Sequence, residues 1–345
     1  MQPPDHIYEP RQLEVFAAHQ GLSHVEIKRF KNLLFKKSVS SDEALALWPQ
    51  PAAALLREQT TFEVLSLLEA HASADGSAEK LIFKTHDDHL IETVILKPAS
   101  GRTTVCISSQ IGCACYCSFC ATGLMGFTRN LSSAEILDQV RQVNQRIEPD
   151  GRRVRNVVFM GMGEPLLNTE AVFEAVEQLI DPACFNLSGA HITMSTVGIV
   201  PGMVAFVEQF SSCRLALSLH SARQEVRQRL MPQAAMYDLS ALKQVLVDCA
   251  SKGTVMIEYL MLAGVTDQPE DLEALTAFVE DIPIHINLIP FNSFAGSNLV
   301  GSEKSVIDAF AQQLKSSGFK VTTRRSLGGD IDAACGQLVQ HKLRS

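Results

Sequence analysis

The sequence lacks the features that mark a membrane or secreted protein. It contains no run of about eighteen apolar residues, and the stretch from Met1 to Asp5 carries neither the basic nor the apolar region of a signal peptide. Internal repeats and low-complexity segments are missing as well. We therefore expect a globular cytoplasmic protein without a membrane segment.

The sequence also lacks an excess of positive charge. The formal net charge is −8 at pH 7, so composition alone does not indicate a nucleic-acid-binding protein. Local basic clusters can still contact phosphates, although such clusters more often lie on a solvated face. The candidate clusters are Lys28 to Lys31, Lys36 with Lys37, Arg152 to Arg155, and Arg324 with Arg325.

Cysteine, in contrast, is abundant. The chain has nine cysteines in 345 residues, and without a signal peptide they argue against a disulfide scaffold and for metal or redox chemistry. Five of them fall in the stretch from Cys106 to Cys120, and Cys335 stands near the end. The other three lie in apolar segments, where we expect buried structural thiols: Cys184, Cys213 and Cys249.

Three of the cysteines have the spacing of an iron–sulfur site. Cys113, Cys117 and Cys120 are separated by three and then two residues. Thiolates this close can hold three corners of a [4Fe–4S] cluster and leave the fourth iron open for a small chelating ligand, and Phe119 suits the apolar shell of such a cluster. Zinc is the alternative, but it usually needs four ligands in two separated pairs, and the sequence offers no second pair.

The apolar pattern divides the chain into three parts. Residues 1–75 form a small helical domain, residues 76–100 a β-hairpin extension, and residues 101–345 an α/β domain. In the first part, helices are expected at 11–18, 25–35, 41–47, 52–57 and 62–70, followed by a linker at 71–78. In the second part, strands at 81–85 and 90–96 flank Asp87 and Asp88.

In the third part, apolar runs alternate with amphipathic segments. Strands are expected at 104–108, 157–162, 191–196, 214–219, 254–262 and 284–290. Helices are expected at 133–147, 170–180, 200–209, 239–251 and 269–280. This alternation predicts parallel strands joined by crossover helices, arranged as a sheet or as a barrel.

Several motifs together resemble one known family. They are Cys106 to Cys113, Cys120 to Leu131, Gly161 to Asn168, Ser218 to His220, and Asp330 to Leu338. Over roughly residues 80 to 340 the sequence resembles the RlmN/Cfr family of radical S-adenosylmethionine enzymes, which methylate an adenosine of ribosomal RNA. The resemblance implies a partial (β/α)6 radical-SAM barrel, with a last strand near Lys320 to Thr323.

The resemblance also implies a cofactor site at the carboxyl ends of the strands. A histidine that closes a strand is more often structural, but polar residues at several successive strand ends favour a site. The [4Fe–4S] cluster would lie on Cys113, Cys117 and Cys120. S-adenosylmethionine would contact Gly163, Glu164, Ser195, Ser218, Leu219, His220 and Asn292.

A covalent mechanism follows from the same resemblance, and it consumes two molecules of S-adenosylmethionine. The first methylates the cysteine matched by Cys335, and the second is cleaved to a 5′-deoxyadenosyl radical that activates the S-methyl group. The cysteine matched by Cys106 then resolves the adduct with RNA, forming a Cys106–Cys335 disulfide. Glu92 matches the general base, although in its segment it also fits the polar position of an alternating strand.

The sequence departs from the family where the substrate is chosen. After Leu230 to Pro232 the family usually continues with Ile-Asn and basic residues, whereas this chain has Gln233 to Tyr237. The N-terminal domain also matches the family only weakly. Glu164 to Asn168 look like the branch that methylates C2 of adenine rather than C8. We expect ribosomal RNA as substrate with transfer RNA as a second candidate, an RNA-contacting N-terminal domain, a flavodoxin or ferredoxin as electron donor, and a monomer.

Two other functions compete with this interpretation. A radical S-adenosylmethionine enzyme that acts on a non-RNA substrate would not depend on Cys335. A non-catalytic iron–sulfur protein that binds RNA would never release 5′-deoxyadenosine. The presence of Cys106, Cys335 and Glu92 counts against both.

Overall fold

The computed structural model describes residues 4–98, 101–324 and 326–338. Its main sheet has the strand order β1-β2-β3-β4-β7-β8-β9-β10-β11-β12, and a second sheet pairs β5 with β6. The strands are β1 (Ser66–Ala72), β2 (Ala78–Lys84), β3 (Leu90–Leu96), β4 (Thr103–Cys106), β5 (Gln110–Gly112), β6 (Phe127–Asn130), β7 (Val154–Phe159), β8 (Ile192–Thr196), β9 (Arg214–Ser218), β10 (Thr254–Met261), β11 (His285–Pro290) and β12 (Lys320–Thr323).

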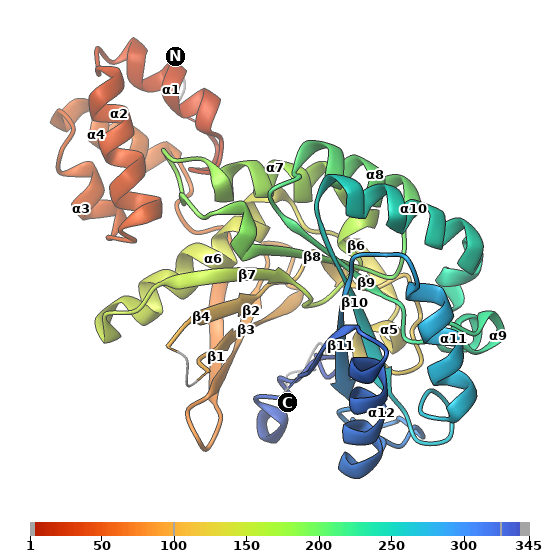
Figure 1. The fold of residues 1–345 in the computed structure, drawn as a ribbon. Coiled ribbons are helices and arrows are strands. Elements are labelled where there is room, and N and C mark those ends of the chain that lie inside the picture. Colours follow the sequence, from red (N-terminus) through yellow and green to blue (C-terminus); the bar gives the residue numbers. More distant parts are fainter. Residues whose placement is uncertain (1–3, 99–100, 325, 339–345) are drawn as a thin grey trace.

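The α-helices cover the sheet and form a separate group at the N-terminus (Figure 1). They are α1 (Pro10–His19), α2 (His24–Lys31), α3 (Ser41–Leu45), α4 (Gln50–Gln59), α5 (Ala121–Leu124), α6 (Ser133–Ile147), α7 (Thr169–Ile180), α8 (Val200–Gln209), α9 (Gln224–Leu230), α10 (Leu239–Lys252), α11 (Pro269–Val279) and α12 (Lys304–Ser316). A π-helical turn, η1 (Asn32–Lys36), extends α2. Short 3₁₀ turns are η2 (Glu148–Asp150), η3 (Pro165–Leu167), η4 (Gly189–His191), η5 (Pro232–Met236) and η6 (Gly329–Ile331). None of the helices within the described ranges is both long and apolar enough to cross a bilayer.

The strands from β4 to β12 in the main sheet form the predicted barrel. Each pairs in parallel with its neighbour, because an amphipathic helix carries the chain back between most of them. The helices lie on the outer side of the curved sheet, and the strand order is linear, so the barrel stays open (Figure 1). The predicted strands and crossover helices of this part are confirmed, as is the partial (β/α)6 barrel. Helix α12 is an element that the sequence analysis did not include.

The predicted hairpin extension is confirmed and joins the barrel directly. Strands β2 and β3 pair antiparallel, and β3 then pairs antiparallel with β4, the first barrel strand. In this register Val94 of β3 stands opposite Cys106 of β4. The extension therefore contributes side chains to the wall beside Cys106.

The helix predicted over 62–70 is wrong. Residues Ser66–Ala72 form strand β1, which pairs antiparallel with β2 at the edge of the sheet. All seven residues of β1 are exposed, so the strand has no buried face and shows none of the alternation that identifies a strand. The sheet therefore begins inside the segment 1–75 that we had assigned to the helical domain.

A buried polar network attaches the N-terminal helices to α6. The Tyr8 hydroxyl donates to Asp138 Oδ1 at 2.5 Å, and Arg141 Nε donates to the Tyr8 hydroxyl at 3.0 Å. Asp138 Oδ2 also accepts from the backbone N–H groups of Val64 and Leu65, both at 2.9 Å. A buried carboxylate needs such donors, so this network holds the helical domain and the start of β1 in one place.

We predict that Tyr8→Phe lowers the free energy of unfolding by about 2 kcal/mol, because the buried Asp138 carboxylate loses a hydrogen-bond donor. Urea denaturation of the cluster-free protein measures the change. Tyr237→Phe is the matched control, because the structure gives the Tyr237 hydroxyl no hydrogen bond among the described residues, and it should alter stability by less than about 0.5 kcal/mol. Equal losses in the two variants would show that the network does not anchor the domain.

Candidate active site

The loop that carries Cys113, Cys117 and Cys120, the predicted cluster ligands, lies between β5 and α5. Its ends are fixed by backbone hydrogen bonds: Cys113 N–H donates to Gly126 O at 2.8 Å, and Ser118 N–H donates to Leu230 O at 2.9 Å. Gly123 packs against the loop so closely that a Cβ there would lie 2.8 Å from Cys117 N. The loop is therefore held in shape by its neighbours on both sides.

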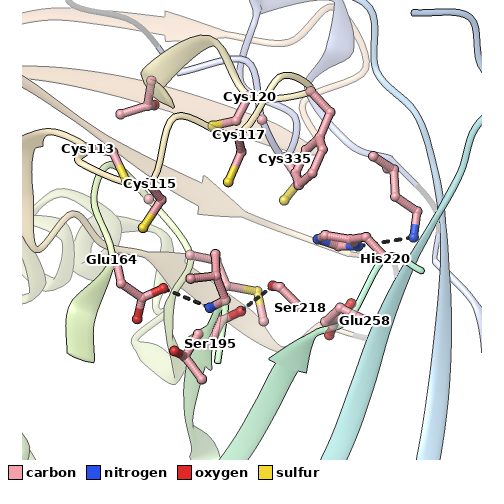
Figure 2. A pocket seen from close by; sticks show the side chains of 18 of the residues that line it. Cys113, Cys115, Cys117, Cys120, Glu164, Ser195, Ser218, His220, Glu258 and Cys335 are labelled. Carbon is pink, nitrogen blue, oxygen red and sulfur yellow. Dashed lines mark hydrogen bonds between the residues drawn. The ribbon is translucent and has the colours of Figure 1, made fainter. Parts of the chain in front are cut away.

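All three cysteines line one cavity at the carboxyl end of the barrel, with about 950 Å³ that no protein atom fills. Figure 2 shows the cysteines on one side of this cavity and Glu164, Ser195 and Ser218 on the other. Val226, Leu230 and Met231 form an apolar cluster with the cysteines, and Phe119 packs against it. We call this space the cofactor cavity.

The thiol set fits a four-iron cluster. Among the described residues, no three histidine, cysteine or carboxylate side chains are arranged to hold a single metal ion. A four-iron cluster needs no such convergence, because each cysteine binds a different iron atom. Burial raises the pKa of Cys120 to about 11, so binding of iron would have to release its proton.

Glu164 forms the opposite wall. Gly163 before it has φ +100°, and a Cβ there would lie 2.5 Å from Gln110 Cβ, so only glycine fits this turn. The Glu164 carboxylate is buried and accepts from Leu166 N–H at 3.0 Å and Val197 N–H at 2.8 Å. Burial raises its pKa to about 7. The Thr196 side chain also bonds to the carboxylate, which leaves one acceptor position for the ammonium group of an amino acid.

The next polar residues come from β8 and β9. Ser195 Oγ and Ser218 Oγ lie 3.3 Å apart, and both line the cofactor cavity. His220 follows in a left-handed conformation with φ +56°, and its Nδ1 accepts from Leu260 N–H at 3.2 Å. Burial and the charge of Arg227 lower the pKa of His220 to about 3. The ring is therefore neutral, with its proton on Nε2.

Arg227 on α9 connects these strand ends, and the sequence analysis did not identify it. Its guanidinium is buried and donates to the backbone carbonyls of Val197, Ser218 and Leu219. Leu219 packs its side chain into the core, so only its main chain could contact a ligand. Arg227 thus fixes the loops that follow β8 and β9.

Cys106 and Cys335 meet at a second cavity of about 620 Å³, which we call the thiol cavity. Cys335 also lines the cofactor cavity and so belongs to both. Both are free thiols in this structure, so the predicted disulfide is not formed. Asn292 lines the thiol cavity rather than the cofactor cavity, and its Nδ2 donates to Cys335 O at 3.3 Å.

Glu92 lies behind the thiol cavity. Its side chain is fully buried and stands 3.6 Å from Lys80 Nζ in an ion pair. Side chains two residues apart on a strand point to the same face, so Glu92 shares a face with Val94, which lines the thiol cavity. As far as the described residues form the two linings, Glu92 is not part of either.

Two further charged residues line the cofactor cavity without having been predicted as site residues. Glu258 lies in β10, where one carboxylate inside an apolar strand was a signal that sequence reasoning could have used. Arg324 had been grouped with surface phosphate contacts, but its side chain lines both cavities. The neighbouring Arg325 lies outside the described residues.

Comparisons with known proteins agree with this geometry. Residues 107–276 match the model of the radical SAM superfamily. A probable RNA methyltransferase of Rhodopirellula baltica is 41% identical over 98% of this chain and 88% of its own length. A dual-specificity RNA methyltransferase RlmN of Bdellovibrio bacteriovorus is 36% identical over 96% of this chain and 82% of its own.

A solved structure has the same fold over nearly the whole chain. The crystal structure of a radical SAM methyltransferase from Sphaerobacter thermophilus superposes with a TM-score of 0.91 and 33% identity. The match covers 97% of this chain and 99% of that one. The N-terminal helices and the hairpin extension are therefore part of the shared architecture.

We predict that Cys113→Ala, Cys117→Ala and Cys120→Ala each abolish cluster binding, because a cluster held at two corners loses a third of its protein ligands. Iron and sulfide content after anaerobic reconstitution measures the effect. Cys115→Ala is the control within the same loop: Cys115 is more buried than the other three but stands outside the spacing, and this variant should keep its iron. Loss of iron in Cys115→Ala would mean that the ligand set is different.

We predict that Glu164→Gln weakens the binding of S-adenosylmethionine by about tenfold or more, because a carboxylate–ammonium hydrogen bond is lost. Equilibrium dialysis with cluster-loaded protein measures the affinity, and Glu174→Gln, on the exposed side of α7, is the control. Because the pKa of Glu164 is raised to about 7, wild-type affinity should also fall as the pH drops through that value and the carboxylate becomes neutral. Unchanged affinity in Glu164→Gln would remove this residue from the binding site.

Proposed function

The chain belongs to the RlmN family of radical S-adenosylmethionine RNA methyltransferases, and from this premise we propose that it methylates C2 of an adenine in ribosomal RNA, with transfer RNA as a second substrate. The observation that carries the proposal is that Cys335 lines both cavities and shares the lining of the thiol cavity with Cys106. Preference for C2 over C8 rests on the segment Glu164 to Asn168, which looks like the C2 branch.

Bound in the cofactor cavity, the [4Fe–4S] cluster and S-adenosylmethionine supply the radical chemistry that an sp² ring carbon requires, since such a carbon is no nucleophile. The chain's own residues bind and orient. Glu164 accepts from the amino group, Ser195 and Ser218 offer hydroxyls to the polar parts of the cofactor, and neutral His220 donates from Nε2. Gly163 permits the close approach of the backbone, and Asn292 would have to reach the cofactor from its place beside Cys335.

Cys335 carries the methyl group between the two cavities. Two equivalents of the cofactor are used per turnover, one for the methyl group and one for the radical step, and the product of that step links the RNA base through a methylene carbon to Cys335. Cys106 then attacks the Cys335 sulfur as a thiolate, forming the S–S bond. The bond between that sulfur and the methylene carbon breaks, and the carbon keeps the electron pair and takes up a proton to become methyl.

Glu92 is the proposed acceptor of the ring proton. Support comes from its position on the β3 face that borders the thiol cavity and from its ion pair with Lys80.

The N-terminal helical domain is the proposed contact for the RNA backbone. Lys28 and Arg29 of α2 are exposed, and so is Lys37, which directly follows η1. Lys31 of the same cluster is not available, because it is buried and pairs with Glu14 at 3.0 Å. An enzyme that acts on cellular RNA works in the cytoplasm, and we propose a monomer that receives electrons from a flavodoxin or ferredoxin.

Mass spectrometry of nucleosides tests the proposal. Deletion of the gene should remove 2-methyladenosine from ribosomal RNA, and re-expression should restore it. Cys335→Ala should restore nothing, because the methyl carrier is missing. Cys106→Ala should accumulate RNA bound covalently to Cys335, whereas Cys249→Ala, a buried thiol of α10, should behave as wild type.

Two results would change the assignment. A gain of 8-methyladenosine on expression would move the reaction to C8. No change in either nucleoside, in cells or with reconstituted protein, would exclude RNA adenine as the substrate and favour a radical enzyme with another target.

A further inference from the structure

Arg324 stands between the two cavities. It follows β12, and its backbone N–H donates to Leu288 O at 2.8 Å, which continues the pairing of β12 with β11. Its side chain lines the cofactor cavity together with Glu258 and lines the thiol cavity together with Cys106 and Cys335. A permanently charged guanidinium thus sits at the junction of the two spaces.

Glu258 holds this guanidinium from inside the barrel. It is only 3% exposed, its Oε1 accepts from Asn287 Nδ2 at 3.1 Å, and its Oε2 lies 3.6 Å from Arg324 Nη1. Among the described residues Oε2 has no hydrogen-bond donor, so the charge of Arg324 is its main compensation. A buried carboxylate in this position strongly favours a nearby cation, which keeps Arg324 turned into the barrel.

The guanidinium keeps donors available for another anion. Besides the ion pair with Glu258, the structure gives the side chain a contact at 3.4 Å from Nη1 to Met160 Sδ, and a thioether is a weak acceptor. A guanidinium has five N–H donors in a planar fork. The groups that share the thiol cavity with these donors include the two cysteine thiols.

The surroundings of Cys106 are otherwise unfavourable for a thiolate. Val94 of β3 and Val158 of β7 are its partners in register on either side, and both are apolar. Burial, and to a smaller extent the neighbouring Cys335, raises the pKa of Cys106 to about 12. Arg324 and the hydrogen bond from the Met160 N–H lower it. Among the described residues, Cys335 and Arg324 are the titratable and charged groups that act on the sulfur, and Arg324 is the cation.

We propose that Arg324, anchored by Glu258, is a positioning residue that stabilises negative charge on the Cys106 sulfur during its attack on Cys335. The proposal deepens the proposed function and rests on it, because it concerns the resolving step. In that step the Cys106 thiolate forms the disulfide, the Cys335 sulfur–methylene bond breaks, and the carbon takes the electron pair and a proton. Arg324 neither gives nor takes a proton in this exchange.

The reactivity of Cys106 towards iodoacetamide tests the proposal without any RNA. Reduced, cluster-loaded protein is alkylated anaerobically at several pH values, and the peptide that contains Cys106 is quantified by mass spectrometry. Arg324→Gln should slow alkylation by about three- to tenfold at each pH below the thiol pKa, since loss of a nearby cation lowers the thiolate fraction more than it raises nucleophilicity. Arg324→Lys should restore most of the rate, because it restores the charge.

Two controls separate charge from folding. Arg214→Met removes a cation at the opposite, amino-terminal end of β9 and should leave the Cys106 rate unchanged. Protection of the buried Cys249 in every variant reports that the fold is intact. An unchanged rate in Arg324→Gln, or an equally slow rate in Arg324→Lys, would overturn the proposal.

The result is independent of the identity of the substrate. If the wild-type protein does not methylate RNA, the proposed function is wrong, but the alkylation rates still test the effect of Arg324 on Cys106. If the wild-type protein methylates RNA but Cys106 is alkylated at the normal rate in Arg324→Gln, the proposed role of Arg324 is wrong and the proposed function is not affected. In the full reaction, Arg324→Gln should accumulate the covalent RNA adduct that Cys106→Ala also accumulates.

Discussion

The site depends on the attachment of the C-terminal segment to the cluster loop. Ala121 N–H donates to Gly336 O at 2.7 Å, and Thr122 Oγ1 donates to Leu338 O at 2.6 Å. Gly336 has φ +84°, and a Cβ there would lie 3.1 Å from Phe119 O, so a side chain would strain the contact. These bonds join segments more than two hundred residues apart and place Cys335, next to Gly336, against both cavities.

The two cavities divide the chemistry between different surroundings. The cofactor cavity combines an apolar wall around the cysteines with a few fixed polar groups, among them Glu164 and neutral His220. Such a cavity keeps water away from a reactive species, and its fixed polar groups need little reorganisation during the reaction. In the proposed mechanism the thiol cavity instead has to support a sulfur anion, and Arg324, which pairs with Glu258, lines this cavity. Cys335 is the thiol that lines both cavities, and Arg324 lines both as well.

Much of this arrangement was predictable, because it depends on local patterns. Buried parallel strands are continuous apolar runs, and the cluster spacing lies within eight residues, so both are visible in the sequence. Strand β1 was missed because an edge strand with every side chain exposed has no hydrophobic signal. The roles of Glu258 and Arg324 come from contacts between distant strands, and a basic pair of residues looks the same whether it faces solvent or a cavity. Asn292 follows β11, as predicted, but it lines the thiol cavity rather than the cofactor cavity. The C-terminal segment determines this, because Asn292 bonds to the Cys335 carbonyl.

The network around Asp138 bears on how a large substrate is positioned. Tyr8, Arg141 and the backbone of residues 64 and 65 surround that carboxylate, so the helical domain is docked through buried charge. Breaking one partner of such a network leaves an uncompensated buried group, which makes partial undocking unfavourable. The exposed Lys28 and Arg29 of α2 therefore stand at a fixed distance from the cavities. Under the proposed function, an RNA that touches both has to present its adenine at that distance, which would select the substrate by shape as well as by base contacts.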